Sequence, residues 1–368
     1  MSSYELQAAA LLRLGRPAEA EAAALKMVAD APYDYIANAR AFLYVGLTAD
    51  LTPAKRQYFE NFARLWPRSL TKLSDADTWA GDFKAAGDDM YALADLDDGF
   101  AGVKNNAPAL VAAASVDYAL AGDMTKSNAL AADARTQIDA WNASGKAMNL
   151  PAIVAETEES LDFQAIVRLW SEGRIAEARA ALGGRSHWFH PGAPGVALMV
   201  ERLRPGAAPG DLHGVLTRDP AQIRAEALAQ RPGSILSNPN ADKLIYGAIR
   251  PLEHDNDYDN LAGAVWRGEN SPYLVKRTGK ETYQGELIIM NGVYGLPAGK
   301  ALLLHAALIA KSRGASAFVT SELRVRLDSA FFRFGSPGDP GLPRQAAFDT
   351  ATVIRDLTAD MSDPAKSH

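Results

Sequence analysis

The chain has 368 residues, of which 48% are hydrophobic and 22% charged, and its net charge is −6 at pH 7. This length suits about two domains, and the negative charge disfavours a nucleic acid as main partner, because phosphate binding needs a basic surface. The chain has no cysteine, which excludes disulfides, thiolate catalysis and cysteine-ligated zinc.

The first 66 residues have the pattern of two helix pairs. Segment 3–31 is interrupted by Leu14-Gly15-Arg16-Pro17, and Pro17 suits the first turn of a second helix. Segment 34–66 repeats the pattern one period of 34 residues later, with Pro53 opening its second helix. The positions expected to pack are Tyr4, Ala8, Leu11, Ala20, Ala24 and Met27 in the first copy, closed by Pro32, and Ala41, Phe42, Val45, Ala54 and Tyr58 in the second, closed by Pro67.

These spacings resemble the tetratricopeptide repeat, a helix pair that buries its apolar faces by stacking on its neighbours. Two further pairs keep the short glycine turn followed by an alanine-rich helix: 109–121 with 124–141, and 163–172 with 175–182. The resemblance therefore implies a mainly α fold, with a TPR-like α-solenoid over residues 1–183.

The remaining chain changes composition twice. Residues 184–239 are rich in proline and glycine, which predicts a connecting region with short helices over 195–204 and 219–230. Residues 240–368 predict a small α+β domain with a strand–strand–helix–strand core. Its expected elements are strands at 273–277 and 286–290, an apolar helix over 297–313 capped by Gly314, strands near 317–319, 325–327 and 332–334, and a final helix over 346–359.

The expected function is that of a non-enzymatic scaffold or adaptor, which binds a partner protein or peptide. In tetratricopeptide proteins the inner surface comes from the first helix of each pair, and the resemblance places Glu5, Ala9, Leu12, Arg13, Ala39 and Leu43 there. This surface is mostly apolar, which favours an extended peptide or a partner's helix as ligand. The sequence leaves open whether the α+β domain covers this surface. The oligomeric state stays open as well.

A second hypothesis is an enzyme or an anion-binding protein with its site in the loop 291–300. Gly295, Gly299 and Lys300 lie between an expected strand and helix, where backbone N–H groups and the helix dipole favour phosphate. However, the glycines are one residue too close for a P-loop, and Ala301 replaces the hydroxyl residue that would bind Mg²⁺. A plain strand–helix connection is the first interpretation of this loop.

Other candidate ligands give no complete site. Asp255, Asp257 and Asp259 alternate as in calcium loops, but Asn260 and Trp266 stand where an EF-hand has glycine and glutamate. His187 and His190 lack a third ligand nearby, and His305 lies in an apolar helix, where a packed histidine is expected. The sequence therefore predicts no catalytic set, no metal site and no cofactor.

Nothing in the sequence predicts an integral membrane segment, because the longest apolar stretch, 301–310, is about half the ~20 residues required. No secretory leader is visible, so a cytoplasmic protein is expected, or a periplasmic one if a leader was removed. The alanine-, glycine-, proline- and arginine-rich composition suggests a bacterial source. The unit 273–319 also resembles a small domain of bacterial envelope lipoproteins, which implies an envelope-associated structural protein as a further alternative.

Overall fold

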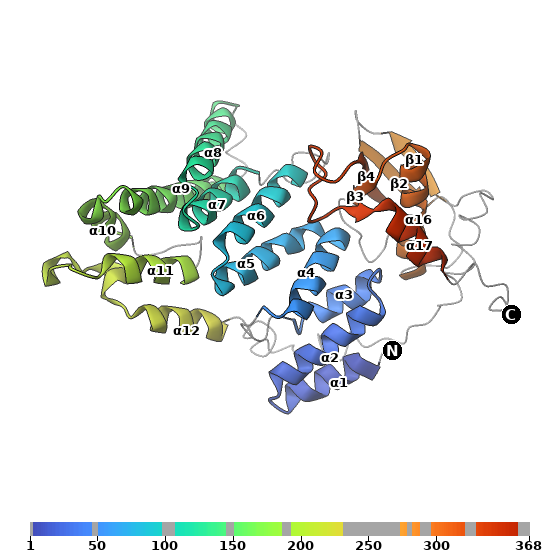
Figure 1. Cartoon of the computed structure of the whole chain (residues 1–368), viewed down its shortest axis with the longest axis horizontal. Coiled ribbons are helices and arrows are strands. Elements are labelled where there is room, and N and C mark those ends of the chain that lie inside the picture. Colours follow the sequence, from blue (N-terminus) through green and yellow to red (C-terminus); the bar gives the residue numbers. More distant parts are fainter. Residues whose placement is uncertain are drawn as a thin grey trace.

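A computed structural model describes residues 3–45, 51–97, 107–144, 151–185, 193–230, 273–277, 282–287, 296–320 and 329–359. These residues are mostly helical, with an antiparallel sheet near the C-terminus (Figure 1). The α-helices are α1 (Ser3–Arg13), α2 (Pro17–Asp30), α3 (Tyr35–Ala41), α4 (Pro53–Leu65), α5 (Leu70–Ala80), α6 (Phe83–Asp97), α7 (Ala107–Leu120), α8 (Met124–Ser144), α9 (Pro151–Ser171), α10 (Ile175–Gly183), α11 (Ala193–Leu203), α12 (Pro220–Gln230), α16 (Leu296–Ser312) and α17 (Thr350–Thr358). Short 3-10 helices are η1 (Pro67–Ser69), η3 (Pro209–Asp211) and η4 (Gly214–Thr217), and the strands are β1 (Tyr273–Arg277), β2 (Thr282–Leu287), β3 (Ala317–Thr320), β4 (Ser329–Gly335) and β5 (Phe348–Asp349).

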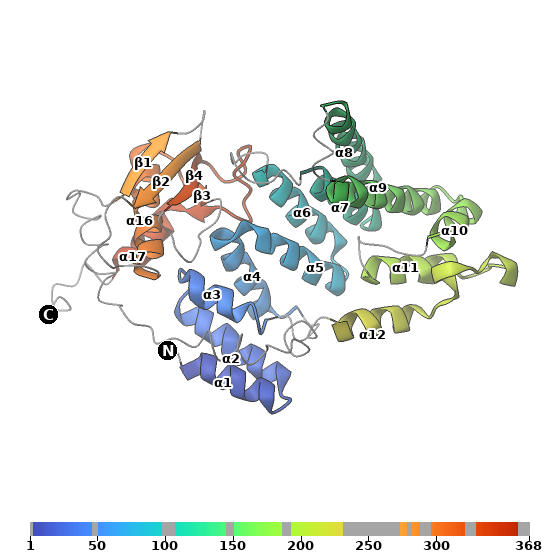
Figure 2. The same ribbon diagram turned by 180° about the vertical axis from the view of Figure 1, so that it is seen from behind.

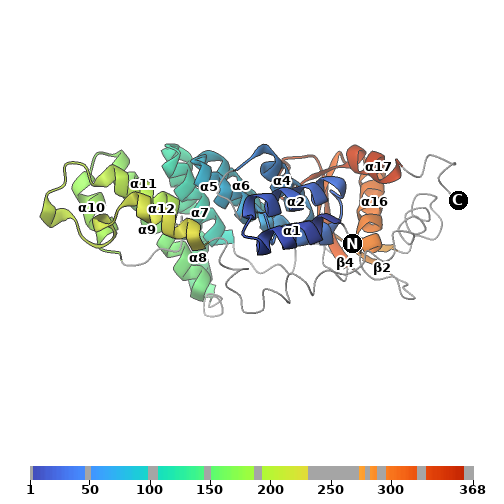
Figure 3. The ribbon, with the colours of Figure 1, turned by 90° about the horizontal axis from the view of Figure 1, so that it is seen from below.

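The molecule is elongated, with the helices placed along it nearly in chain order. Helices α10–α12 form one end, the sheet with α16 and α17 forms the other, and α1–α6 lie between them (Figures 1 and 2). Seen from below, the helices form a shallow layer from which α8 projects (Figure 3).

Four connections between consecutive helices share one geometry. Their glycines have positive φ, a conformation that costs other residues strain: Gly15 at 70°, Gly81 at 83°, Gly122 at 87° and Gly173 at 77°. The N–H after each glycine donates to the carbonyl five residues earlier at 2.9–3.0 Å, as in a Schellman motif. Five residues after each glycine lies a small side chain with 0% exposure: Ala20, Ala86, Ser127 and Ala178. The sequence predicted three of these turns and missed that at Gly81.

In the first helix pair, the expected packing residues are buried except Tyr4, which is half-buried against the core. Ala8, Ala20 and Ala24 are fully buried, and Leu11 and Met27 nearly so. In the second pair, Ala41, Val45 and Tyr58 are buried, but the prediction that Ala54 packs is wrong, because Ala54 is exposed. Thr52 caps α4 by accepting from the Lys55 N–H at 3.3 Å, so Ala54 lies in the exposed first turn.

The buried residue beside that position is a lysine. Lys55 of α4 is 2% exposed, and its Nζ lies 2.7 Å from Oε1 of Glu21 on α2, itself 5% exposed. Lys55 and Glu21 are separated by one period of 34 residues in the sequence. The ion pair therefore joins equivalent helices of the first two pairs.

The helices expected in the connecting region pack into a core. Side chains of α11, η4 and α12, such as Met199, Leu216 and Ile223, form one hydrophobic cluster with Phe163 and Leu182 of α9 and α10. Helix α11 also contacts α5. Residues 193–230 thus extend the packed helices.

The C-terminal sheet has the strand order β1-β2-β4-β3-β5, with every neighbouring pair antiparallel. Strand β1 has its predicted bounds, whereas β2 begins at Thr282, earlier than the predicted 286. It begins there because β2 pairs along all of β1, from Arg277 opposite Tyr283 to Tyr273 opposite Leu287. The turn predicted from Thr278 and the strand predicted at 325–327 lie outside the described residues.

Helix α16 follows the predicted pattern. Leu302, Leu303, Leu304 and Ala307 are fully buried, because β3, β4 and α17 pack against it. Gly314 ends it with φ 70°, and the Ala315 N–H donates to the Ala310 carbonyl at 2.9 Å.

The final helix is shorter than predicted. Phe348 and Asp349 form β5 opposite β3, so α17 begins only at Thr350. The Asp349 side chain caps it by accepting from the Thr352 N–H at 2.7 Å.

The C-terminal unit packs directly on the N-terminal helices. Helix α16 contacts α3, strand β3 contacts α4, and both regions belong to one hydrophobic cluster. The Tyr33 ring stacks on Phe348 at 6.5 Å between centroids, and its hydroxyl donates to Oδ2 of Asp356 at 2.8 Å. Two regions more than 300 residues apart therefore share a core.

Candidate functional site

The predicted binding residues of α1 lie at its junction with α3. Glu5 is 3% exposed, and its Oε2 accepts a hydrogen bond from Nη1 of Arg40 at 2.9 Å. Burial raises the pKa of Glu5, while the charge and hydrogen bond of Arg40 oppose that rise. Glu5 thus has a partner within the chain.

The remaining predicted residues divide into buried and accessible ones. Ala9 is fully buried and Leu12 is 3% exposed, so neither offers surface to a ligand. Arg13 is exposed, and Ala39 and Leu43 of the α3 region are half-buried against the core. The accessible part of the predicted face is therefore Arg13, Ala39 and Leu43.

Helices from later in the chain contact the first helices of two pairs. Helix α16 contacts α3, and α11 contacts α5 and shares a core with α7 and α9. Both later helices bring apolar side chains, for example Leu302 of α16 and Val200 of α11. The first helices α3 and α5 therefore pack against apolar helices of the same chain.

The predicted anion-binding loop is only partly described. Gly295 lies outside the described residues, whereas Gly299 and Lys300 lie in the first turns of α16, where Lys300 is half-buried. The positive end of the α16 dipole lies at these turns. Anion binding there stays a prediction.

The other candidate motifs are not assembled into a site by the described residues. His187, His190, Asp255, Asp257 and Asp259 lie outside them. Burial lowers the pKa of His305 to about 4, so this imidazole is neutral at pH 7. Within the described ranges, no three histidine, aspartate or glutamate side chains are grouped to bind a metal ion, and no helix could cross a bilayer.

A buried acidic cluster was missed by the sequence analysis. Asp77 of α5 is fully buried and pairs with the guanidinium of Arg56 of α4. Asp89 of α6 is 5% exposed and lies close enough to Asp77 for the two carboxyl groups to interact. Burial, and next the charge of Asp77, raise the pKa of Asp89 to about 8, so its carboxyl is protonated at neutral pH.

A different group of contacts surrounds the neighbouring carboxylate, Asp88. It accepts hydrogen bonds from Lys84 Nζ at 2.7 Å and from the Tyr118 hydroxyl of α7, while Lys126 Nζ lies 3.6 Å away. Burial opposes ionisation of Asp88, but these donors and positive charges outweigh it and lower the pKa. Adjacent aspartates on α6 thus differ in protonation, because two lysines act on Asp88, whereas Asp89 is more deeply buried and the nearby Arg56 is paired with Asp77.

One sequence signal could have revealed the cluster. Asp89 falls among the buried positions of α6, which include Ala86, Met90, Leu93 and Leu96. An acidic residue in the apolar stripe of a helix indicates a buried charge that needs a partner. The partners themselves come from other helices and cannot be read locally.

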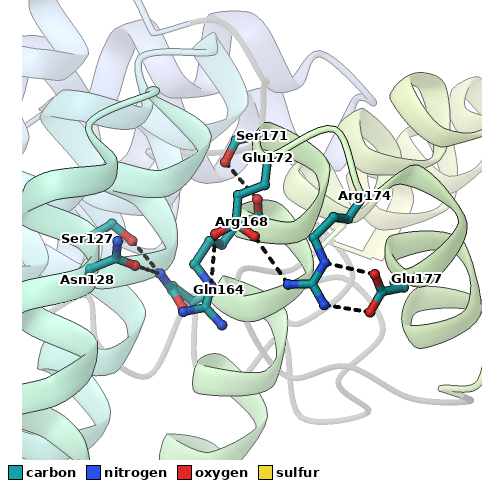
Figure 4. Close-up of polar contacts among 8 residues, drawn as sticks. All are labelled: Ser127, Asn128, Gln164, Arg168, Ser171, Glu172, Arg174 and Glu177. Atoms are coloured by element: carbon teal, nitrogen blue, oxygen red, sulfur yellow. Dashed lines mark hydrogen bonds and ion pairs between the residues drawn. The ribbon is translucent and has the colours of Figure 1, made fainter.

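A polar network joins the helices farther along the chain (Figure 4). Gln164 of α9 donates from Nε2 to Ser127 Oγ and Asn128 Oδ1 of α8, both at 2.9 Å. Beyond it, Arg174 forms hydrogen bonds to Glu177 at 2.6 and 2.8 Å across the start of α10. The buried part positions α9 on α8, whereas the arginine pair lies in solvent.

These clusters hold helices together. No protein-family model, curated protein or solved structure matches this chain, so its sequence and geometry alone support a function.

Proposed function

We propose that the protein is a non-catalytic binding scaffold of the TPR-like α-solenoid class, and that it recognises an apolar helix or peptide of a partner protein. The observation that carries this proposal is the contact of the chain's own apolar helices with the first helices of two pairs, α16 with α3 and α11 with α5. A surface that buries apolar helices from the same chain has the chemistry to bind one from a partner.

The repeated turn supports the solenoid class. Each of the four Schellman turns is followed at the same distance by a fully buried small residue, so the helix pairs close in the same way. The spacing between successive glycines varies, from Gly15 to Gly81 to Gly122 to Gly173. The proposed solenoid is thus built from pairs with one turn and unequal helices.

The proposed contact surface is the accessible part of the predicted face, Arg13, Ala39 and Leu43. It combines half-buried apolar groups with one exposed cation. Such a surface suits an amphipathic segment that places an apolar side chain on Ala39 and Leu43 and an acidic one near Arg13.

Site-specific photo-crosslinking in the producing cell tests this proposal. A photoreactive residue at Ala39 is expected to crosslink a partner protein, and Arg13→Glu is expected to reduce the yield several-fold through charge reversal. The matched control carries the same photoreactive residue at Ala129, an exposed alanine of α8.

Equal crosslinking from positions 39 and 129, or a yield that Arg13→Glu leaves unchanged, would overturn the assignment of this surface. Far-UV circular dichroism of each variant shows whether the helices are retained, so that a lost crosslink reports on the surface.

The alternative proposal is anion binding at the start of α16. It is supported by the place of Lys300 in the first turns of that helix, where the dipole favours an anion. Titration with inorganic phosphate and with ATP distinguishes it: binding that survives Lys300→Ala removes this loop from consideration.

A further inference from the structure

Helix α6 lies between the acidic cluster and a loop of the C-terminal unit. On one side, its Asp89 meets Asp77 and Arg56. On the other, Oδ2 of Asp95 accepts from the backbone N–H of Gly341 at 2.8 Å. One helix therefore contacts both α5 and residues 336–347.

The docked loop is a compact structure closed by its own hydrogen bonds. The Gly338 N–H donates to the Leu342 carbonyl at 2.7 Å, and the Ser336 N–H donates to Oδ2 of Asp339 at 2.7 Å. Leu342 is 2% exposed. Gln345 Nε2 reaches the backbone carbonyl of Asp88, the residue next to Asp89, at 3.5 Å.

The cluster beneath this loop contains more buried acids than bases. Arg56 pairs with Asp77, and Oδ2 of Asp89 is buried with no hydrogen-bond partner among the described residues. Glu60 of α4 and Asp88 of α6 add further negative charge near Asp89. Among the described residues, a second ionised carboxylate at this place would have to share Arg56 with Asp77.

In the part of the chain that the structure describes, Arg56 is the cation that acts on Asp89. From α7, Tyr118 donates to Asp88, and the buried Asp117 has Asp75 of α5 as its charged neighbour. Arg68 of η1, which contacts α6, is exposed. The protonation of Asp89 therefore decides whether this region holds one or two negative charges opposite Arg56.

We propose that Asp89 acts as a proton-controlled latch: its neutral carboxyl holds α6 on α5 and keeps residues 336–347 docked, and loss of its proton releases that loop. When neutral, Asp89 donates a hydrogen bond to the carboxylate of Asp77. When ionised, it repels Asp77 in a site with little water, where like charges interact strongly. The displacement of α6 weakens the contacts at Asp95 and at the Asp88 carbonyl.

The charge change falls in an accessible range. Burial and the charge of Asp77 raise the pKa of Asp89 to about 8. Mildly alkaline solution is therefore expected to remove this proton while the exposed carboxylates, already ionised, stay unchanged.

Hydrogen exchange of the Gly341 amide in the full-length protein tests the latch, because this N–H makes the bond to Asp95. After correction for the intrinsic pH dependence of exchange, protection in the wild type is expected to fall about tenfold or more from pH 6.5 to 9. Asp89→Asn, which keeps the shape and stays neutral, is expected to keep its protection across this range.

Asp133→Asn, which neutralises an exposed acid of α8, is the matched control and is expected to follow the wild type. A wild type whose Gly341 protection does not change with pH, or an Asp89→Asn protein with the wild-type profile, would overturn the latch. If Asp89→Asn does not fold, the carboxyl ¹³C shift of Asp89 in the wild type decides, because an Asp89 that titrates below pH 6 contradicts the proposal.

Discussion

Two buried charged sites in adjacent helix pairs differ in their balance of charge. At the first, the buried Lys55 cation forms an ion pair with the buried Glu21 carboxylate. At the second, Arg56, the next residue of α4, faces Asp77 with Asp89 behind it. Lys55 and Arg56, consecutive residues of α4, thus belong to two different sites. The first is an ion pair, and the second has more acidic than basic side chains. Burial alone does not make a site sensitive to pH, whereas burial of unequal charges does.

The largest expected effect on stability comes from breaking the ion pair between Lys55 and Glu21. Lys55→Met removes the buried cation that lies 2.7 Å from the Glu21 carboxylate and is expected to lower the free energy of unfolding by about 3–5 kcal/mol. The double variant Lys55→Met/Glu21→Met is expected to recover most of this loss, because neither charge remains. Urea unfolding followed by circular dichroism measures both. A double variant as unstable as the single one would show that the lysine stem, and not the charge, carries the effect.

At the cluster around Asp89, the free energy of unfolding is expected to depend on pH. Asp89 has a raised pKa of about 8 when folded and about 3.9 when unfolded, so between these values the folded state binds one more proton. Unfolding free energy of the wild type therefore falls as pH rises from 4 to 8. Asp89→Asn removes that slope and is expected to be more stable than the wild type by about 3 kcal/mol at pH 6, with a larger difference at pH 8. Urea titrations at pH 5, 6, 7 and 8 measure the difference, and a constant difference would contradict it.

Breaking the ion pair between Glu5 of α1 and Arg40 of α3 is expected to have an intermediate effect on stability. Arg40→Met removes the hydrogen bond from Arg40 to Glu5, but Arg40 is 16% exposed, so solvent moderates the loss. An unfolding free energy lower by about 1–3 kcal/mol is expected. Thermal unfolding checks the value, with Arg40→Lys as a control that keeps the charge and loses the forked geometry.

The smallest effect is expected at the exposed arginine of Figure 4. Arg174 and Glu177 are about half exposed, and such pairs add little to stability in water. Arg174→Ala is expected to leave the thermal midpoint within experimental reproducibility. A clearly lower thermal midpoint would show that the strength of these ion pairs depends on their geometry as well as on their burial.

The sequence predicted the local features of the fold better than the contacts between its helices. The turns at Gly15, Gly122 and Gly173 were found because glycine followed by an alanine-rich helix is a local signal. The turn at Gly81 was missed because Lys72, Asp75 and Asp77 interrupt the apolar pattern of α5 before it. Strand β1 was predicted with its bounds, whereas the start of β2 depends on the register with β1 and could not be.

The candidate site was the least predictable part. Ala9 and Leu12 have the composition of an apolar surface, but their burial follows from the packing of α1 within the core. Likewise, Asp89 becomes a buried acid only because α5 and α4 bring Asp77 and Arg56 to it. Such properties depend on which helices meet, and one sequence without its tertiary contacts does not contain that information locally.

The repeated Schellman turn lets the two helices of a pair differ in length while the geometry of the turn between them stays the same. The same corner joins α7 of 14 residues to α8 of 21, and α9 of 21 residues to α10 of 9. Whole helical turns can therefore be added or removed at the ends away from the glycine without changing how the corner closes. The chain can lengthen one arm, as in the projecting α8, and leave the stacking of the next pair as it was.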